Sequence, residues 1–299
     1  MACMNLPAET DVPPGHAGRD VITGHAEIFA MGGQQAPTVA IGPAETTAIH
    51  GFAETTAICG DVVMTVITGL ADILVMDGHV KMVATDGPVE TKARRGLVET
   101  SVMNGPAVTS ATRGNAEISV IPGNAGTDAT LGPAVIIVIH GPVEMTAIHG
   151  TVATAVRDGL VVTTVPIGLA ATTATTGLVR KTVRIGSAVT DVTIGVARNN
   201  VTHGSAAMSA PSGSVMNFAP IGLVEIIAQT GNAMVGVVPG NAGTTAAAGM
   251  PVVQVRSGLA EMDATIGNAV ETARLGNAEM DALIGKSMLH SVASGLKVA

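Results

Sequence analysis

Small or apolar residues alternate with polar ones along this chain in a pattern that restarts every nine residues. Glycine marks each restart and recurs without a slip from Gly15 to Gly285. If glycine is column one, column three is Ala or Val in every repeat except at Gln35, Pro251 and Ser287. Column seven is Ala or Val throughout from Val21 to Ala282, and column five is mostly Thr, Ile or Met.

Columns one, three, five and seven therefore alternate with more variable columns, which is the period of a half-buried β-strand. A helix is disfavoured, because glycine would recur every two and a half turns and cost about 1 kcal/mol each time. The residue after glycine is often Pro, Asn, Leu or Ser, as in Gly42-Pro43 and Gly114-Asn115. Such pairs favour turns in which glycine adopts a positive φ. The pattern predicts one strand of about six residues per repeat.

Stacked strands of this kind predict an all-β fold, a nonapeptide-repeat β-solenoid in which each repeat buries its small residues against its neighbours. Two repeats could make one coil of 18 residues, but the sequence does not fix the number of residues per coil. The period is similar to that of the calcium-binding β-roll, whose nonapeptide is Gly-Gly-x-Gly-x-Asp. Because the doubled glycines and the turn aspartate are missing here, no calcium ligand is predicted. The alternative is a largely disordered low-complexity repeat.

The repeat also divides the chain. Residues 15–285 form the predicted tandem-repeat region, residues 1–14 an irregular N-terminal tail, and residues 286–299 an irregular C-terminal tail.

The composition limits both the core and the partners. The 299 residues include no Trp or Tyr and three Phe, so a core must come from small aliphatic side chains and threonine methyl groups. The net charge is −8 without a basic cluster, which argues against a nucleic-acid partner. No apolar run reaches the roughly 18 residues of a membrane span, so none is expected. The two cysteines, Cys3 and Cys59, have no metal or redox spacing.

No catalytic, cofactor-binding or metal-binding residue is predicted, and the chain is not expected to be an enzyme. Gly285-Lys286-Ser287 resembles the end of a phosphate-binding loop, but Met280 stands where that motif needs glycine. Four histidines fall in column nine, where a polar turn residue is a simpler interpretation than a metal ligand: His50, His140, His149 and His203. Five glutamates in column four are interpreted as a solvated face rather than as acid–base pairs: Glu45, Glu54, Glu90, Glu99 and Glu144. The threonines at 172–176 are too irregular to predict an ice-binding array.

The exchanges within columns follow the genetic code more closely than side-chain size. Ala and Val interchange in columns three and seven, yet neither Ile nor Leu replaces them there, although a core site that accepts Val should tolerate both. Ala and Val codons differ by C or T at the second base, as do those of Thr and Ile or Met. In a frame that starts at the third base, this difference falls on a usually silent position. That frame would encode a Gly/Tyr/Arg-rich nonapeptide repeat.

Three hypotheses for function follow. The first is a non-enzymatic structural or surface-interaction repeat protein, with self-association through strand edges. The second is an out-of-frame or overlapping translation of a Gly/Tyr/Arg-rich repeat gene, without a selected function. The third is an ice- or metal-binding solenoid, which requires a regular ladder of like side chains. The sequence identifies neither a partner nor a compartment.

Overall fold

The structure, a computed structural model, describes the backbone of residues 7–11, 15–21, 25–30, 32–267, 269–284, 287–291 and 296–298. These residues form fifteen β-strands, and none of them is helical. The strands are β1 (Pro7–Asp11), β2 (Gly15–Val21), β3 (His25–Ala30), β4 (Gly33–Ile41), β5 (Ala44–Cys59), β6 (Val62–Asp86), β7 (Val89–Asn104), β8 (Ala107–Pro122), β9 (Ala125–Leu131), β10 (Ala134–His140), β11 (Val143–Ala219), β12 (Ile221–Gly267), β13 (Ala269–Ile284), β14 (Ser287–Ser291) and β15 (Leu296–Val298).

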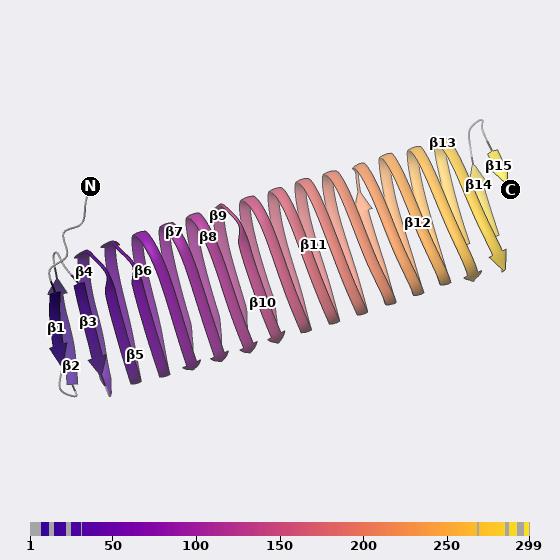
Figure 1. Ribbon diagram of the computed structural model, residues 1–299. Helices are drawn as coiled ribbons and strands as arrows, with labels where there is room; N and C mark the ends of the chain where they lie inside the picture. The colour runs from indigo at the N-terminus through magenta and orange to yellow at the C-terminus, as the bar shows by residue number, and fades with distance from the viewer. Residues whose placement is uncertain are drawn as a thin grey trace. The chain divides into compact units, whose positions relative to one another are not determined.

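The strands pair in parallel, and partners stand 18 positions apart in the sequence. Ala44 pairs with Val62 between β5 and β6, Gly204 with Gly222 between β11 and β12, and Ala278 with Leu296 between β13 and β15. A constant offset means that the chain advances by one coil every 18 residues and lies in register on the coil before it (Figure 1). The chain is therefore a β-solenoid, which confirms the fold expected from its pattern.

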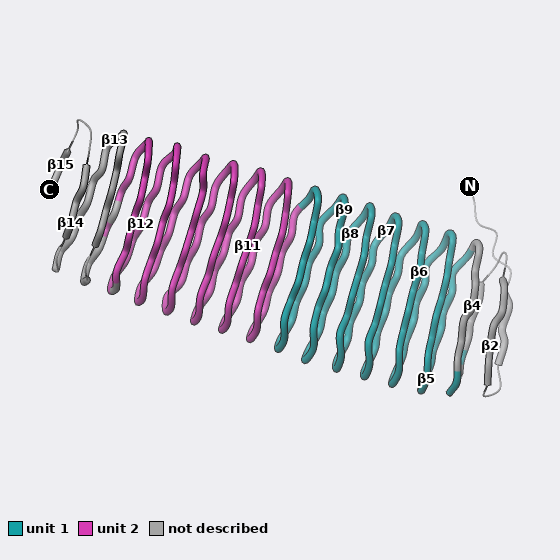
Figure 2. The backbone as a smooth tube through the Cα atoms, turned by 180° about the vertical axis from the view of Figure 1, so that it is seen from behind, with its two compact units in different colours: residues 1–150 teal, residues 151–299 magenta. Residues whose placement is uncertain are grey.

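The chain divides into two compact units, residues 1–150 and residues 151–299 (Figure 2). The boundary falls inside β11. Within each unit the same arrangement of coil on coil is seen. Strand β1 lies in the segment 1–14, and β14 and β15 lie in the segment 286–299, both of which the sequence assigns to irregular tails.

The strands are much longer than the six residues expected from the repeat. β6 has 25 residues and continues through both Gly69 and Gly78. The corners bend the chain without interrupting the hydrogen-bond ladder, because each corner lies in register on the corner of the neighbouring coil, as in the pairing of Gly51 with Gly69. Glycine supplies the bend through a positive φ, which is 139° at Gly69 and 150° at Gly78. The bends therefore come from the backbone conformation of glycine rather than from separate turns.

The core of each unit consists of columns three, five and seven. Val62, Met64 and Val66 are buried in unit 1, and the residues on either side of Met64 point outward. In a strand, alternate side chains point to opposite faces, so these three columns share the inner face. The glycines of column one lie at the corners of the coil with a positive φ, as the turn-forming pairs in the sequence predict.

Column-five side chains meet across the core from facing strands. Thr46 and Thr55, which are half a coil apart, have their hydroxyl oxygens at 3.4 Å. Further along unit 1, the hydroxyl oxygen of Thr100 lies 3.4 Å from that of Thr91 and 3.3 Å from that of Thr109. The space between the facing strands is therefore narrow enough to be filled by one short side chain from each strand, as the lack of aromatic residues requires.

Among the residues that the structure describes, no helix of a length and apolarity suited to crossing a membrane occurs.

Candidate functional site

The histidines of column nine are exposed at the corners and are not gathered into a metal site. His140 lies in register with Pro122, and His149 lies in register with Leu131. The spacing of nine positions between these two histidines is half a coil, so they lie at opposite corners. His50 Nδ1 instead forms a hydrogen bond with Thr68 Oγ1 of the following coil. Within the described part of the chain, no group of three or more His, Cys, Asp or Glu side chains is placed to hold a metal ion.

The other candidates from the sequence lie mainly at the surface. The side chains of Glu45, Glu54, Glu90 and Glu144 are exposed, and that of Glu99 is half-buried. Among the threonines at 172–176, Thr172 points into the core, while Thr173 and Thr175 point outward. The positions one coil away from Thr173 are Ala155 and Asp191, so no threonine ladder forms there. Gly285 and Lys286 lie outside the described residues.

An apolar patch on the outer surface of unit 2 consists of Met216, Phe218 and Met234. Met216 pairs in register with Met234 and Phe218 pairs with Gly236, so the three side chains occupy neighbouring strands of one sheet face. They are 38%, 47% and 49% exposed, respectively. A β-carbon on Gly236 would lie 3.0 Å from Cδ2 of Phe218, which shows that the ring covers this glycine. This patch depends on the register between coils, which the sequence pattern alone does not give.

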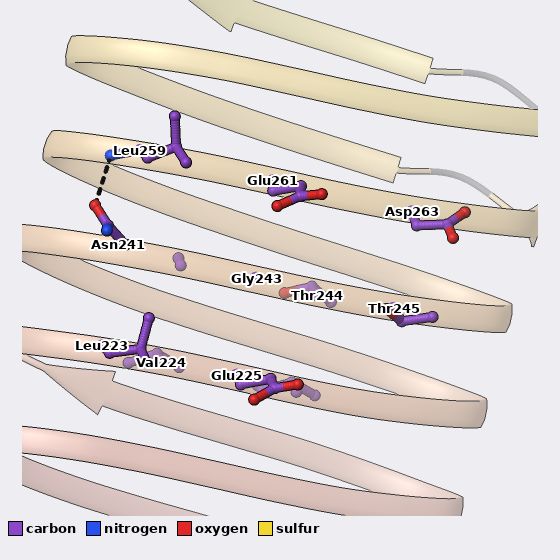
Figure 3. A pocket seen from close by; sticks show the side chains of 12 residues that line it. Leu223, Val224, Glu225, Asn241, Gly243, Thr244, Thr245, Leu259, Glu261 and Asp263 are labelled. Carbon is purple, nitrogen blue, oxygen red and sulfur yellow. Dashed lines mark hydrogen bonds between the residues drawn. The ribbon is translucent and has the colours of Figure 1, made fainter.

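A second surface feature of unit 2 is a hollow of about 410 Å³ centred on Gly243. Gly243 has no side chain, and nothing lies within 4 Å of where its β-carbon would be. Figure 3 shows the carboxylates of Glu225 and Glu261 on the strands to either side, with Asp263 further along. At one end of the hollow, the side-chain oxygen of Asn241 accepts a hydrogen bond of 3.1 Å from the backbone N–H of Leu259. The hollow is therefore acidic and open, but its carboxylates are spread over alternate strands.

Acidic side chains are stacked more closely on the outer surface of unit 1. Glu54, Asp72 and Glu90 lie in register on three successive coils. Burial raises the pKa of the Asp72 carboxyl, and the charge of Glu90 raises it further, while Lys92 acts in the opposite direction. Lys92 Nζ lies 2.6 Å from Glu90 Oε1, and this contact with Glu90 raises the pKa of the lysine. We refer to Glu54, Asp72 and Glu90 as the acidic ladder.

The most unusual buried group is Lys181, which occupies column five in unit 2 and is 1% exposed. Its Nζ crosses the core and donates hydrogen bonds to the carbonyl oxygens of Ala170, at 3.2 Å, and of Val189. Burial lowers the pKa of this lysine from 10.5 to about 6. Lys181 is visible in the sequence as an exception within a column of mostly Thr, Ile and Met, but its burial and its acceptors are not.

Other polar atoms in the same column lack partners. The side chain of Asn217 is buried with neither its oxygen nor its nitrogen hydrogen-bonded, and the hydroxyls of Thr163 and Thr172 are also unpaired. Buried polar groups in folded proteins are normally hydrogen-bonded. In contrast, no leucine is among the buried core residues that the structure describes, while eight leucines are 38–49% exposed: Leu70, Leu74, Leu131, Leu160, Leu169, Leu178, Leu223 and Leu259. Most of the core is apolar, but the burial of unpaired polar groups while leucines lie at the surface departs from the usual distribution.

The chain was compared with protein families, curated proteins and solved structures. No protein-family model matches the chain, and neither the curated proteins nor the solved structures contain a match.

Proposed function

We propose that this chain is a non-enzymatic structural repeat protein that acts through the outer surfaces of its coils. The observation that carries this proposal is the apolar patch of Met216, Phe218 and Met234, which is held on a flat sheet face by the register of the coils. Exposed contiguous apolar surface marks an interaction site on soluble proteins. Methionine and aromatic residues are enriched at the centres of such sites.

The partner that we propose is a second copy of the same chain. The structure offers two kinds of surface for it. One is the apolar patch, which would be removed from water by pairing with the same patch on another copy. The other is a strand edge: among the described strands, β1, β2, β14 and β15 each pair with one neighbour only. Backbone groups on an unpaired edge are a template for a further strand.

Sedimentation velocity of the full chain over a range of concentrations tests this proposal. We expect the wild type to form dimers or larger species, and Met216→Lys with Met234→Lys to shift it toward the monomer, because each lysine adds a charge to the patch. Thr182→Lys with Asn200→Lys is the matched control, since both of these side chains also point outward in unit 2.

The outcomes separate the two surfaces. Association that persists unchanged in the methionine variant assigns the contact to the strand edges. A wild type that stays monomeric at every concentration rejects self-association.

A second candidate is that the chain is an incidental translation, out of frame with or overlapping a Gly/Tyr/Arg-rich repeat gene. The observation that favours it is the composition of the core, in which the polar side chains of Lys181 and Asn217 are buried while eight leucines lie outside. Selection for a stable fold removes unpaired buried polar groups. A substitution in this chain that is silent in the Gly/Tyr/Arg-rich frame would not be removed by selection for a stable fold.

Peptide mass spectrometry of the source cells tests this second candidate. Spectra are searched against this frame and against the frame that starts at its third base. Tryptic peptides from this chain would reject the incidental translation, for example the peptide that ends at Arg198. Peptides from the Gly/Tyr/Arg-rich frame alone would support it.

A further inference from the structure

Lys181 is held in the core of unit 2 by a hydrogen-bond arrangement that suits a neutral amine. A neutral lysine amine has two N–H groups, and the structure supplies two acceptors, the carbonyl oxygens of Ala170 and Val189. A protonated amine has three N–H groups. The third would have no acceptor at this position, and the positive charge would be buried without a partner, which is strongly unfavourable.

The surrounding core residues offer no counter-charge. Thr163 and Asn199 occupy column five one coil before and one coil after Lys181, and Thr172 and Thr190 face it from the opposite strand. Thr190 uses its hydroxyl to donate to Asn199 Oδ1 at 2.9 Å. None of these four side chains titrates.

The charged residues of the same and the adjacent coils point outward. Arg180, Arg184, Asp191 and Arg198 are all exposed. Three of these four are basic, so they would not neutralise a positive charge on Lys181 inside the coil. The structure therefore accommodates the amine by keeping it neutral, and not by pairing it.

We propose that the coils around Lys181 form a proton-controlled latch, which is closed while the amine is neutral and opens locally when the amine takes up a proton. Opening brings the amine to water, where the ammonium group is hydrated. The latch is independent of the proposed structural role, since it requires only that unit 2 folds as described.

The direction of the pH dependence follows from the two states. The open state holds its proton up to the ordinary pKa of 10.5, whereas in the closed state burial lowers the pKa to about 6. Between these values the open state binds more protons, so lowering the pH favours opening. In this window each pH unit changes the opening equilibrium about tenfold. Below the lower value both states are protonated, and the dependence disappears.

Hydrogen–deuterium exchange of the full chain, with rates corrected for the intrinsic pH dependence of exchange, measures this opening. We expect the protection factors of residues 168–201 to rise about tenfold per pH unit from about pH 7 to about pH 9. Peptides from residues 89–122 of unit 1 serve as an internal reference and should show no such rise.

Substitutions at Lys181 make the test specific. Lys181→Met should remove the pH dependence and keep residues 168–201 protected, since methionine already occupies the same column at Met64 and Met208. Lys181→Thr is the second variant, because threonine occupies the neighbouring column-five positions. Lys181→Arg should leave the segment unprotected at every pH, because arginine stays charged.

Lys92→Met removes an exposed lysine from an ion pair in unit 1 and should leave the pH dependence of residues 168–201 intact. The latch is rejected if wild-type protection of residues 168–201 does not vary with pH. It is equally rejected if Lys181→Met or Lys181→Thr retains the full dependence.

Discussion

The backbone carbonyl oxygen of Gly78 occupies the space that a β-carbon on Gly96 would need, so the two glycines stack directly at one corner of unit 1. Gly96 also has a φ of 132°, a conformation that residues with a side chain rarely adopt. Two independent constraints, backbone conformation and contact with the coil below, therefore require glycine here. Most of the column-one glycines that the structure describes meet the same two constraints.

Gly96→Ala should destabilise unit 1 by more than about 2 kcal/mol, because the substitution combines backbone strain with overlap against a backbone atom that has no room to move. Urea unfolding followed by circular dichroism measures the change. Gly126→Ala is the control. Gly126 faces outward in column four without a positive φ, and its added β-carbon would lie 3.7 Å from Val108 Cγ2. This control should be neutral or stabilising by up to about 1 kcal/mol. Equal effects of the two substitutions would contradict the role assigned to the corner.

Asn217→Met should stabilise unit 2 by about 1–3 kcal/mol, since it removes two buried polar atoms that have no hydrogen-bond partner. Methionine occupies the same column at Met208, half a coil away. The midpoint of urea unfolding should move to a higher concentration without a change in slope. A lower midpoint would show that Asn217 has partners in solution.

Thr100→Val should destabilise unit 1, whereas Asn217→Met stabilises unit 2. Thr100 bridges the hydroxyls of Thr91 and Thr109 across the core of unit 1, so its removal leaves both without that partner. The expected loss is about 1 kcal/mol, measured by the same unfolding experiment. Thr127→Val in the same unit is a suitable comparison, because the hydroxyl of Thr127 is buried and unpaired, and its removal should not destabilise.

Asp72→Asn should stabilise unit 1 near neutral pH. The pKa of Asp72 is raised above 3.8, first by burial and then by Glu90, so folding disfavours its charged form. For a carboxyl group with a raised pKa, this cost is complete above the folded-state pKa and disappears below the unfolded-state value. Wild type and Asp72→Asn should therefore differ at about pH 7 and converge below about pH 3.5. The thermal unfolding midpoint at both pH values checks this, with Glu45→Gln as an exposed control. An Asp72→Asn benefit that persists at the lower pH would exclude the acidic ladder as its cause.

Much of the fold could be predicted from the repeat alone. The Ala and Val of columns three and seven, exemplified by Val62 and Val66, identified the inner face because side-chain alternation is a local property of a strand. The same logic placed glycine at the bends. It did not show that β6 continues through Gly69 and Gly78, since a ladder that survives a corner depends on a partner 18 residues away.

The candidate sites were less accessible to sequence reasoning. The apolar patch exists because Met216 and Met234 lie in register, and the hollow exists because Gly243 stands between the strands that carry Glu225 and Glu261. The residues that form each of these two features come from different repeats of the sequence. Lys181 was visible as an exception within its column, but its two acceptors come from a facing strand.

The sequence by itself determined that the chain is a β-solenoid and which columns face inward, because both follow from the alternation of side chains and the conformational range of glycine. Only the tertiary structure decided which side chains become neighbours. Residues 18 apart are brought together by the backbone ladder, and residues nine apart meet across the core. Contacts of this kind depend on how coils stack, and stacking is a property of the folded chain rather than of any single repeat.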